Sequence, residues 1–198
     1  MKSHIFRERD GSTPLDPDQI LGLKFSHITT MGELDELEDE NIQRGLLWLN
    51  RQKGDYLSLE FLKKLHKELF GDVWKWAGTF RKSEVNLSKT MSHYVSVELK
   101  NLFEDAKVWV QQQSFSWEEM AVEFHYRLVS IHPFPNGNGR TARILTEYFE
   151  RRNGRPVTNW KESLRENPKE RRRQYIQALR DADKGDLSSL AEFMKEKA

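Results

Sequence analysis

The chain lacks cysteine, an excess of charge and any long apolar run. Without cysteine it has no disulfides and no thiolate metal sites. Its 32 basic and 31 acidic residues give a net charge of +1, so we expect no direct nucleic-acid partner and no attraction to an anionic membrane. No stretch approaches the roughly 18 apolar residues of a membrane span, and the charged first residues contain no signal-peptide core. We therefore expect a cytoplasmic protein.

The residues that build a folded core are present. The composition is 37% hydrophobic, with 6 Trp and 11 Phe, whereas disordered chains lack such residues. At 198 residues, one principal core is expected. Residues 1–30 contain Gly11, Pro14, Pro17 and Gly22 and show no sustained period, which predicts an irregular N-terminal arm. Residues 31–198 form the predicted helical domain, and its first helix, within 31–52, is a candidate regulatory element.

Helical spacing of apolar residues dominates from Met31 onward and predicts a series of helices. The clearest start is a capping box made by Ser116 and Glu119. Pro133 disfavours helical geometry in the residue before it, so this helix should end at His132. The helix that follows should stop at the left-handed pair 153–154. Further helices are predicted around the leucine stripe of 59–69, in 97–110, and after the starts at 167–168 and 186.

One stretch, between Trp76 and Tyr94, does not fit a helix. It contains Gly78, small polar residues and the alternating triplet Val85, Asn86 and Leu87. This pattern favours a short β-hairpin or an extended flap.

The segment 132–143 joins two predicted helices and reads HPFPNGNGRTAR. Its Gly residues alternate with Asn directly before a helix start, where exposed backbone N–H groups and the helix dipole favour an anion. Arg140 and Arg143 lie on one face of the first turn and can grip successive phosphates. His132, with an ordinary pKa near 6.5, suits a general base. Separately these features would indicate a cap, a turn and a surface pair; their order and spacing make the segment specific.

This order resembles the Fic family pattern H-x-F-x-[D/E]-G-N-G-R-x-x-R. The flanks 76–81, Tyr175 and 182–186 also look like a Fic core. The opening segments Thr13–Asp16 and His27–Thr30 resemble the subgroup called mobile mystery protein B. The resemblance implies an all-helical Fic-type fold with a short β-hairpin flap, and transfer of AMP from ATP to a Ser, Thr or Tyr hydroxyl of a target protein or of the chain itself.

The resemblance also implies roles for individual residues. His132 would be the base, and Phe134 would anchor the loop in the core. The phosphates would be held by Gly137, Asn138, Gly139, Arg140 and Arg143. The flap residues Val85, Asn86 and Leu87 would align an extended segment of the target by strand addition. Tyr175 is a weak candidate for contacting adenine, and core packing is the alternative for it.

Asn136 is the one departure from the family pattern. The acid expected at this position holds Mg²⁺, and Asn136 offers only a neutral carbonyl oxygen. Asn136 is therefore a weak metal ligand and a member of the nucleotide-binding loop. A nucleotide-binding or partner-binding module with weak or lost catalysis is an alternative. A Fic-fold phosphotransferase is a further one, although its loop carries Lys where this chain has Gly139.

Many Fic proteins are restrained by a helix with the pattern [S/T]-x-x-x-E-[G/N], whose Glu pairs with the second Arg of the loop. Glu40 and Asn41 fit the end of that pattern, but Glu36 replaces the Ser or Thr. Glu40 is therefore a candidate inhibitory residue, and a solvated acidic face is the competing interpretation. An inhibitory or antitoxin-like protein partner is a further expectation from the family.

Overall fold

The computed structural model describes residues 20–85, 88–158, 160 and 168–195, and the regular structure in this part of the chain is helical. In order, the elements are α2 (Met31–Leu49), α3 (Leu59–Phe70), the 3-10 helix η1 (Ser92–Tyr94), α4 (Val95–Gln112), α5 (Trp117–Ile131), α6 (Asn138–Arg152), α7 (Pro168–Ala182) and α8 (Ser188–Lys195). The prediction of a helical fold is confirmed. None of the helices described is both long and apolar enough to cross a bilayer.

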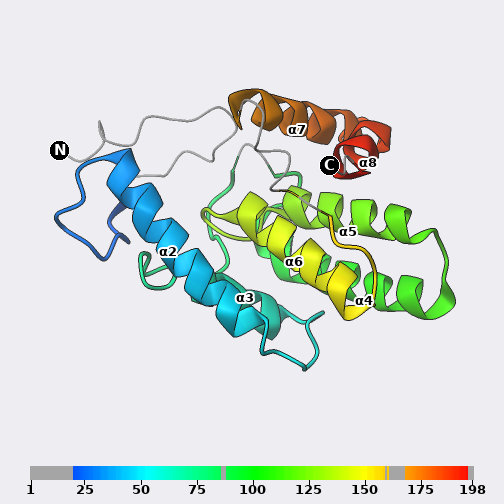
Figure 1. Cartoon of the computed structure of the whole chain (residues 1–198), viewed down its shortest axis with the longest axis horizontal. Coiled ribbons are helices and arrows are strands. Elements are labelled where there is room, and N and C mark those ends of the chain that lie inside the picture. Colours follow the sequence, from blue (N-terminus) through cyan, green and yellow to red (C-terminus); the bar gives the residue numbers. More distant parts are fainter. Residues whose placement is uncertain (1–19, 86–87, 159, 161–167, 196–198) are drawn as a thin grey trace.

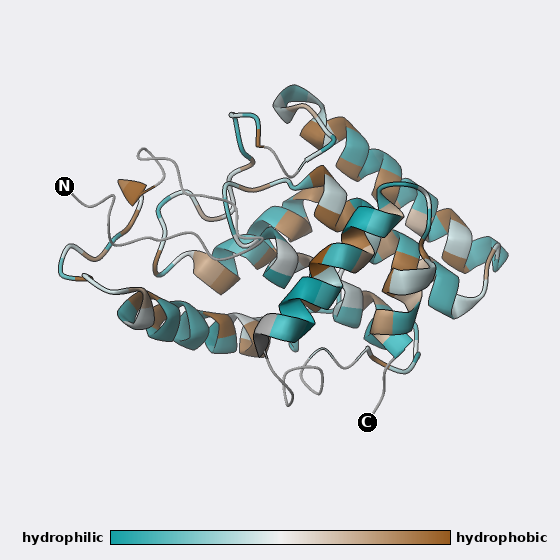
Figure 2. Cartoon of the chain, turned by 90° about the horizontal axis from the view of Figure 1, so that it is seen from above, coloured by the Kyte–Doolittle hydropathy of each residue, from teal (hydrophilic) through white to brown (hydrophobic). Residues whose placement is uncertain are grey.

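Most helices that are neighbours in the sequence also pack against one another, and α5 lies among α4, α6 and α8. Helix α5 contacts α4 and α6, while α2 packs on α3, and α3 also contacts α4 and α6 (Figure 1). Helices α7 and α8 form a pair that lies against the same bundle through α8 and α5. Apolar and polar residues alternate along the helices (Figure 2), as expected for helices buried on one face.

Two hydrophobic clusters hold these helices together. The larger one joins α2 to α6 and contains fully buried aromatic side chains at its centre, among them Phe70, Phe103, Phe124, Phe134 and Phe149. The smaller one joins α5 to the C-terminal pair through Val122, Trp160, Tyr175, Leu190 and Met194. The motif loop 132–137 connects α5 to α6, so both clusters fix the helices that carry it.

The helix ends around the motif form as predicted. The side chain of Ser116 accepts the N–H of Glu119 at 3.3 Å, and the carboxylate of Glu119 accepts the N–H of Ser116 at 2.9 Å. Helix α5 ends at Ile131, directly before His132. Gly154, just beyond α6, has a left-handed φ of 67°.

The predicted β-hairpin is absent from the described part of the flap, which contains no strand; Asn86 and Leu87 lie outside the described residues. Arg81 accounts for this. Its guanidinium donates to the carbonyl oxygens of Ser83 and Thr90, on the two sides of the flap, so both carbonyls bond to a side chain instead of to an opposite strand. The segment that precedes α2 is also irregular, and its Leu23 makes an isolated antiparallel bridge with Trp74.

Candidate active site

His132 lies at the C-terminal cap of α5 in a left-handed conformation, with φ 51° and ψ 59°. Only 8% of the residue is exposed. Its Nδ1–H donates to the carbonyl oxygen of Val129 at 3.3 Å, so the lone pair of the neutral ring lies on Nε2. Burial lowers the pKa of His132 to about 4. The imidazole is therefore neutral near pH 7, which is the form that can accept a proton.

Arg81 fixes the backbone of this histidine. Its Nε donates to the His132 carbonyl oxygen at 2.7 Å, and its own N–H donates to the Pro133 carbonyl oxygen at 2.9 Å. The rest of the guanidinium faces the flap and donates to Ser83 O and to Ser88 Oγ, both at 2.9 Å. The sequence marked Arg81 only as part of a family flank, and its role was missed because its partner lies 51 positions away.

The motif loop is held from inside by its own residues. Phe134 is fully buried, as the anchoring role requires. The side chain of Asn138 accepts the N–H of Phe134 and donates to its carbonyl oxygen, both at 2.8 Å. The sequence predicts that Asn138 holds phosphate, but its side chain is buried and stabilises the loop through these two hydrogen bonds. Only its backbone N–H remains for a ligand.

The backbone N–H groups of residues 138–140, at the start of α6, form a potential anion-binding site, here called the anion cradle. Gly137 caps the helix with a φ of 77°, and a Cβ there would lie 2.8 Å from the Phe70 ring. The backbone N–H groups of residues 138–140 have no intrahelical partner, as at any helix start. A Cβ on Gly139 would meet only Arg143 Nη2, at 3.8 Å. Packing therefore does not demand glycine at 139, and its bare backbone leaves room beside the donors.

Two arginines accompany this cradle. Arg140 donates to Glu38 Oε2 at 2.6 Å, and its guanidinium lies 4.6 Å from the Phe70 ring centre. The guanidinium of Arg143 lies 5.0 Å from the ring centre of Tyr175, and its buried Nε has no hydrogen-bond partner among the described residues. The charged guanidinium of Arg143, close to the start of α6, is suited to an incoming anion.

Tyr175 supports Arg143 from α7. Its hydroxyl donates to Nε2 of His125 at 2.9 Å, and Nδ1–H of His125 donates to Thr146 Oγ1 at 3.2 Å. These directions follow because the Thr146 hydroxyl already donates to the carbonyl oxygen of Ala142. Burial lowers the pKa of His125 to about 3, which keeps the ring neutral. Tyr175 therefore packs in the core, which is the alternative to an adenine contact. No contact in the described residues places it against adenine.

The inhibitory role considered for Glu40 stays a prediction. The side chain of Glu40 is 66% exposed and pairs with Arg44 on its own helix at 2.6 Å. Glu38 is the acidic residue that reaches the loop, and it binds the first arginine, Arg140. Its other oxygen accepts Nε1–H of Trp74 at 2.6 Å. Residues two apart on a helix point to nearly opposite sides, which explains why an acidic run did not reveal the buried one.

Asn136 does not form a metal site with its neighbours. Its side-chain oxygen accepts the N–H of Gly137 at 2.6 Å, and its main-chain oxygen is bonded to His66 Nε2 at 3.0 Å. In the described part of the chain no three acidic or histidine side chains gather where they would hold a metal. One neutral, already engaged oxygen does not fit a protein-held Mg²⁺ site.

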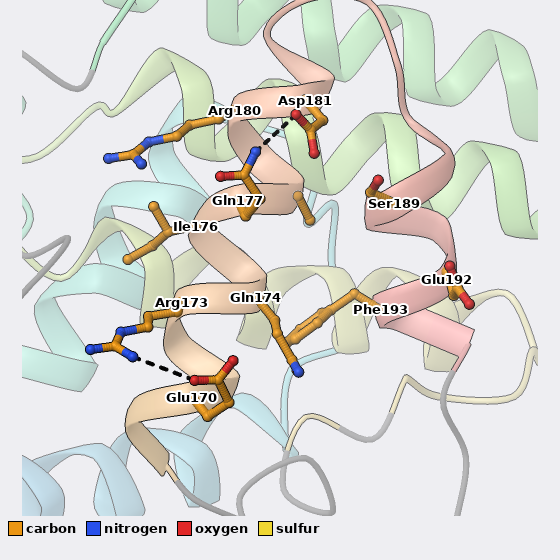
Figure 3. Close-up of a pocket in the computed structure, with 11 residues that line it drawn as sticks. Glu170, Arg173, Gln174, Ile176, Gln177, Arg180, Asp181, Ser189, Glu192 and Phe193 are labelled. Atoms are coloured by element: carbon orange, nitrogen blue, oxygen red, sulfur yellow. Dashed lines mark hydrogen bonds and ion pairs between the residues drawn. The ribbon is translucent and has the colours of Figure 1, made fainter.

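A hollow lies between α7 and α8 (Figure 3). This cleft of about 790 Å³ has polar and apolar lining residues. Two polar pairs lie among them: Glu170 with Arg173 at 3.6 Å, and Gln177 with Asp181 at 3.0 Å. No residue of the motif lines it. The candidate active site is therefore the loop at the start of α6, not this cleft.

Comparison with known families agrees with this geometry. The model of the Fic/DOC family matches residues 56–149, which include the motif loop. The chain carries a Fic/DOC family domain. The subgroup resemblance stays a prediction.

Curated relatives are similar over most of this chain. It is 29% identical over 147 residues to "Protein adenylyltransferase fic-1" of Caenorhabditis elegans, an alignment that covers 71% of this chain and 27% of the relative. It is 31% identical over 143 residues to "Protein adenylyltransferase Fic" of Drosophila mojavensis, covering 70% of this chain and 27% of that protein. The chain thus spans about a quarter of the length of these relatives.

Solved structures share the fold. BepC of Bartonella tribocorum, solved with bound AMPPNP, superposes with a TM-score of 0.68 at 17% identity over 84% of this chain and 87% of the other. Fic-1 of Caenorhabditis elegans superposes with a TM-score of 0.62 at 25% identity over 88% of this chain and 50% of the other.

Proposed function

We propose that the chain is a protein adenylyltransferase that transfers AMP from ATP to a hydroxyl group of a target protein. The observation that carries the proposal is the placement of a neutral, buried His132 and a helix-start anion cradle on one short loop. The position of Arg143 close to the start of α6 supports it, because a guanidinium suits a phosphate. The names of the curated relatives support the same activity.

Two groups share the proposed reaction: His132 accepts the proton, and the anion cradle with its arginines binds the phosphates. Nε2 of His132 takes the proton of the target hydroxyl, and the oxygen attacks the α-phosphorus of ATP. The bond between that phosphorus and the oxygen bridging to the β-phosphate breaks, and pyrophosphate leaves. The N–H groups of residues 138–140 and the two arginines offset the charge on the leaving phosphates. The low pKa of His132 favours the neutral ring before reaction.

Mg²⁺ enters this proposal with the nucleotide, as part of the ATP substrate. The loop offers only the amide oxygen of Asn136, which already accepts a backbone hydrogen bond. Further proposals concern the target. The segment around Val85 would align an extended target segment, and Arg81 connects this segment to His132. The cytoplasmic location, the target protein and the inhibitory or antitoxin-like partner stay predictions from the sequence.

The test uses ATP labelled at either the α or the γ position, with mass spectrometry of the protein itself. We expect protein-bound label from the α position alone. His132→Ala should lower transfer by about 10² to 10⁴ and leave ADP affinity nearly unchanged, because the histidine acts on the hydroxyl. His93→Ala, at an exposed position in η1, is the matched control. Wild-type turnover in His132→Ala would remove the histidine from the mechanism.

The other outcomes identify the alternatives. Label from the γ position alone would indicate a phosphotransferase. Nucleotide binding without any transfer would indicate a binding module, which is the outcome that the missing carboxylate at Asn136 favours. Neither outcome would change the fold or the family assignment.

A further inference from the structure

His66 of α3 lies directly beneath the motif loop and takes no part in the proposed chemistry. The residue is 0% exposed. Its ring stacks on Phe134, with 3.6 Å between ring centres and 16° between ring planes. It shares the buried face of α3 with Leu62, Leu65 and Leu69. A buried polar ring in such a place must have its hydrogen bonds satisfied.

The partners of His66 define a single tautomer. The backbone N–H of Gly78 donates to Nδ1 at 2.9 Å, so Nδ1 carries the lone pair. The proton is then on Nε2, which donates to the carbonyl oxygen of Asn136 at 3.0 Å. A doubly protonated ring would turn a donor toward the N–H of Gly78. Only the neutral ring fits both partners.

We propose that His66 is a positioning residue that sets the orientation of the anion cradle, the backbone N–H groups at the start of α6. This inference rests on the proposed function. The carbonyl of Asn136 precedes the left-handed Gly137, whose own carbonyl accepts the N–H and the hydroxyl of Thr141, both at 2.9 Å. Holding the Asn136 carbonyl inward fixes the peptide that leads into Gly137. The direction of the first N–H groups of α6 follows from that peptide.

The same ring also connects the cradle to the base of the flap. Gly78 has a φ of 81°, and a Cβ there would lie 2.9 Å from the Lys63 carbonyl oxygen of α3. This turn lies three residues before Arg81, which holds the His132 carbonyl. One neutral imidazole thus bridges two parts of the chain: the turn that leads into the flap and the loop that would bind phosphate. Burial, with a smaller contribution from the charge of Arg140, lowers the pKa of His66 to about 3.

Two nearly isosteric substitutions separate the two hydrogen bonds. In His66→Gln the side-chain amide nitrogen takes the place of Nε2, so the donor to Asn136 is kept and the acceptor for Gly78 is lost. In His66→Asn the shorter amide keeps the acceptor near Nδ1 and loses the donor. His66→Phe keeps an aromatic face on Phe134 and loses both. Melting temperature and ADP affinity are measured for each, with KM for ATP and kcat of AMP transfer.

We expect His66→Gln to bind ADP within about threefold of the wild type, while His66→Asn and His66→Phe bind about tenfold more weakly, the loss typical of one positioned hydrogen bond. KM should rise more than kcat falls, because His132 is untouched. Equal ADP affinity in Gln and Asn variants would overturn the proposal, as would wild-type affinity in a folded His66→Phe. Failure of all three variants to fold would also overturn it by making His66 a stability residue. A wild type that binds ADP but transfers no AMP would instead refute the proposed activity.

Discussion

The main-chain carbonyl oxygen of His132 accepts a 2.7 Å hydrogen bond from Nε of Arg81. The side chain of Arg81 is 0% exposed, and its other nitrogens donate to Ser83 and Ser88 on the two sides of the flap. The proposed base and the proposed target-binding segment therefore share one anchor. A left-handed conformation at a non-glycine residue such as His132 is uncommon, and this hydrogen bond stabilises it.

Arg81→Lys should lower both stability and transfer. A lysine keeps the charge, but a single ammonium group cannot reach the same set of acceptors, and each buried acceptor left unpaired costs about 1–3 kcal/mol. We expect the melting temperature to fall by about 5–10 °C and kcat to fall by about tenfold or more. Differential scanning fluorimetry and AMP transfer measure the two effects.

Arg44→Lys is the matched control. Arg44 is 51% exposed and pairs with Glu40 and Asp72 on the surface, where ion pairs contribute little. Its melting temperature and activity should stay close to those of the wild type. Equal effects of the two substitutions would show that the buried hydrogen bonds of Arg81 have no special weight.

Glu38→Gln should strengthen ATP binding. The amide keeps an acceptor for Trp74 but no longer attracts Arg140, so the arginine becomes available to phosphate. We expect ATP affinity to rise by about three- to tenfold, the scale of one partly exposed charged hydrogen bond. Isothermal titration with ATP measures this change.

Glu40→Gln provides the comparison on the same helix, because Glu40 is exposed and, among the residues that the structure describes, pairs with Arg44. It should leave ATP affinity unchanged. If Glu38→Gln binds ATP no better than Glu40→Gln, Arg140 stays with Glu38 in the bound state and the contact is purely structural.

Local signals in the sequence predicted the helix ends that shape the site. Pro133 marked the end of α5 at His132, and Ser116 with Glu119 marked its start, because proline geometry and capping act over a few residues. The positive φ of Gly154 followed in the same way from an Asn-Gly pair. Each of these features depends only on neighbours in the chain.

The supports of the loop depend on residues far away in the chain, and these were missed or misplaced. The partner of Arg81 is 51 positions away, and that of His66 is 70 positions away. A signal for His66 was present, since it lies within the leucine stripe of α3, where a polar residue must find partners. Whether Glu38 or Glu40 contacts the motif loop depends on which face of α2 is buried against α3. That face is set by packing.

Asn136→Asp should reduce the Mg²⁺ requirement. The carboxylate keeps an oxygen for the N–H of Gly137, which now bonds at 2.6 Å, and adds the full charge that Mg²⁺ prefers. We expect the Mg²⁺ concentration for half-maximal AMP transfer to fall by about tenfold at fixed ATP, the effect of about 1.4 kcal/mol. Asn50→Asp, at the exposed end of α2, is the control. The same Mg²⁺ dependence in the wild type and in Asn136→Asp would make Asn136 a loop-geometry residue.

Mild acid should destabilise the folded chain through its buried histidines. Burial lowers the pKa values of His66 and His125 to about 3 and that of His132 to about 4. In the unfolded chain these rings titrate near 6.5, so the unfolded state binds more protons below that pH. The stabilisation is complete above about pH 6.5 and is lost as the pH falls toward the folded-state values. Three such rings predict a loss of about 5 kcal/mol between pH 7 and pH 5.

Urea unfolding at pH 7, 6 and 5 measures this loss. Carboxylates with lowered pKa values, such as Glu33 and Glu119, reduce stability only when the pH falls below about 4.5, so they do not account for a change in this window. His125→Gln should remove about one third of the pH dependence, because one titrating ring is gone. A free energy of unfolding that stays flat from pH 7 to pH 5 would show that the buried rings are accessible to protons in the folded state.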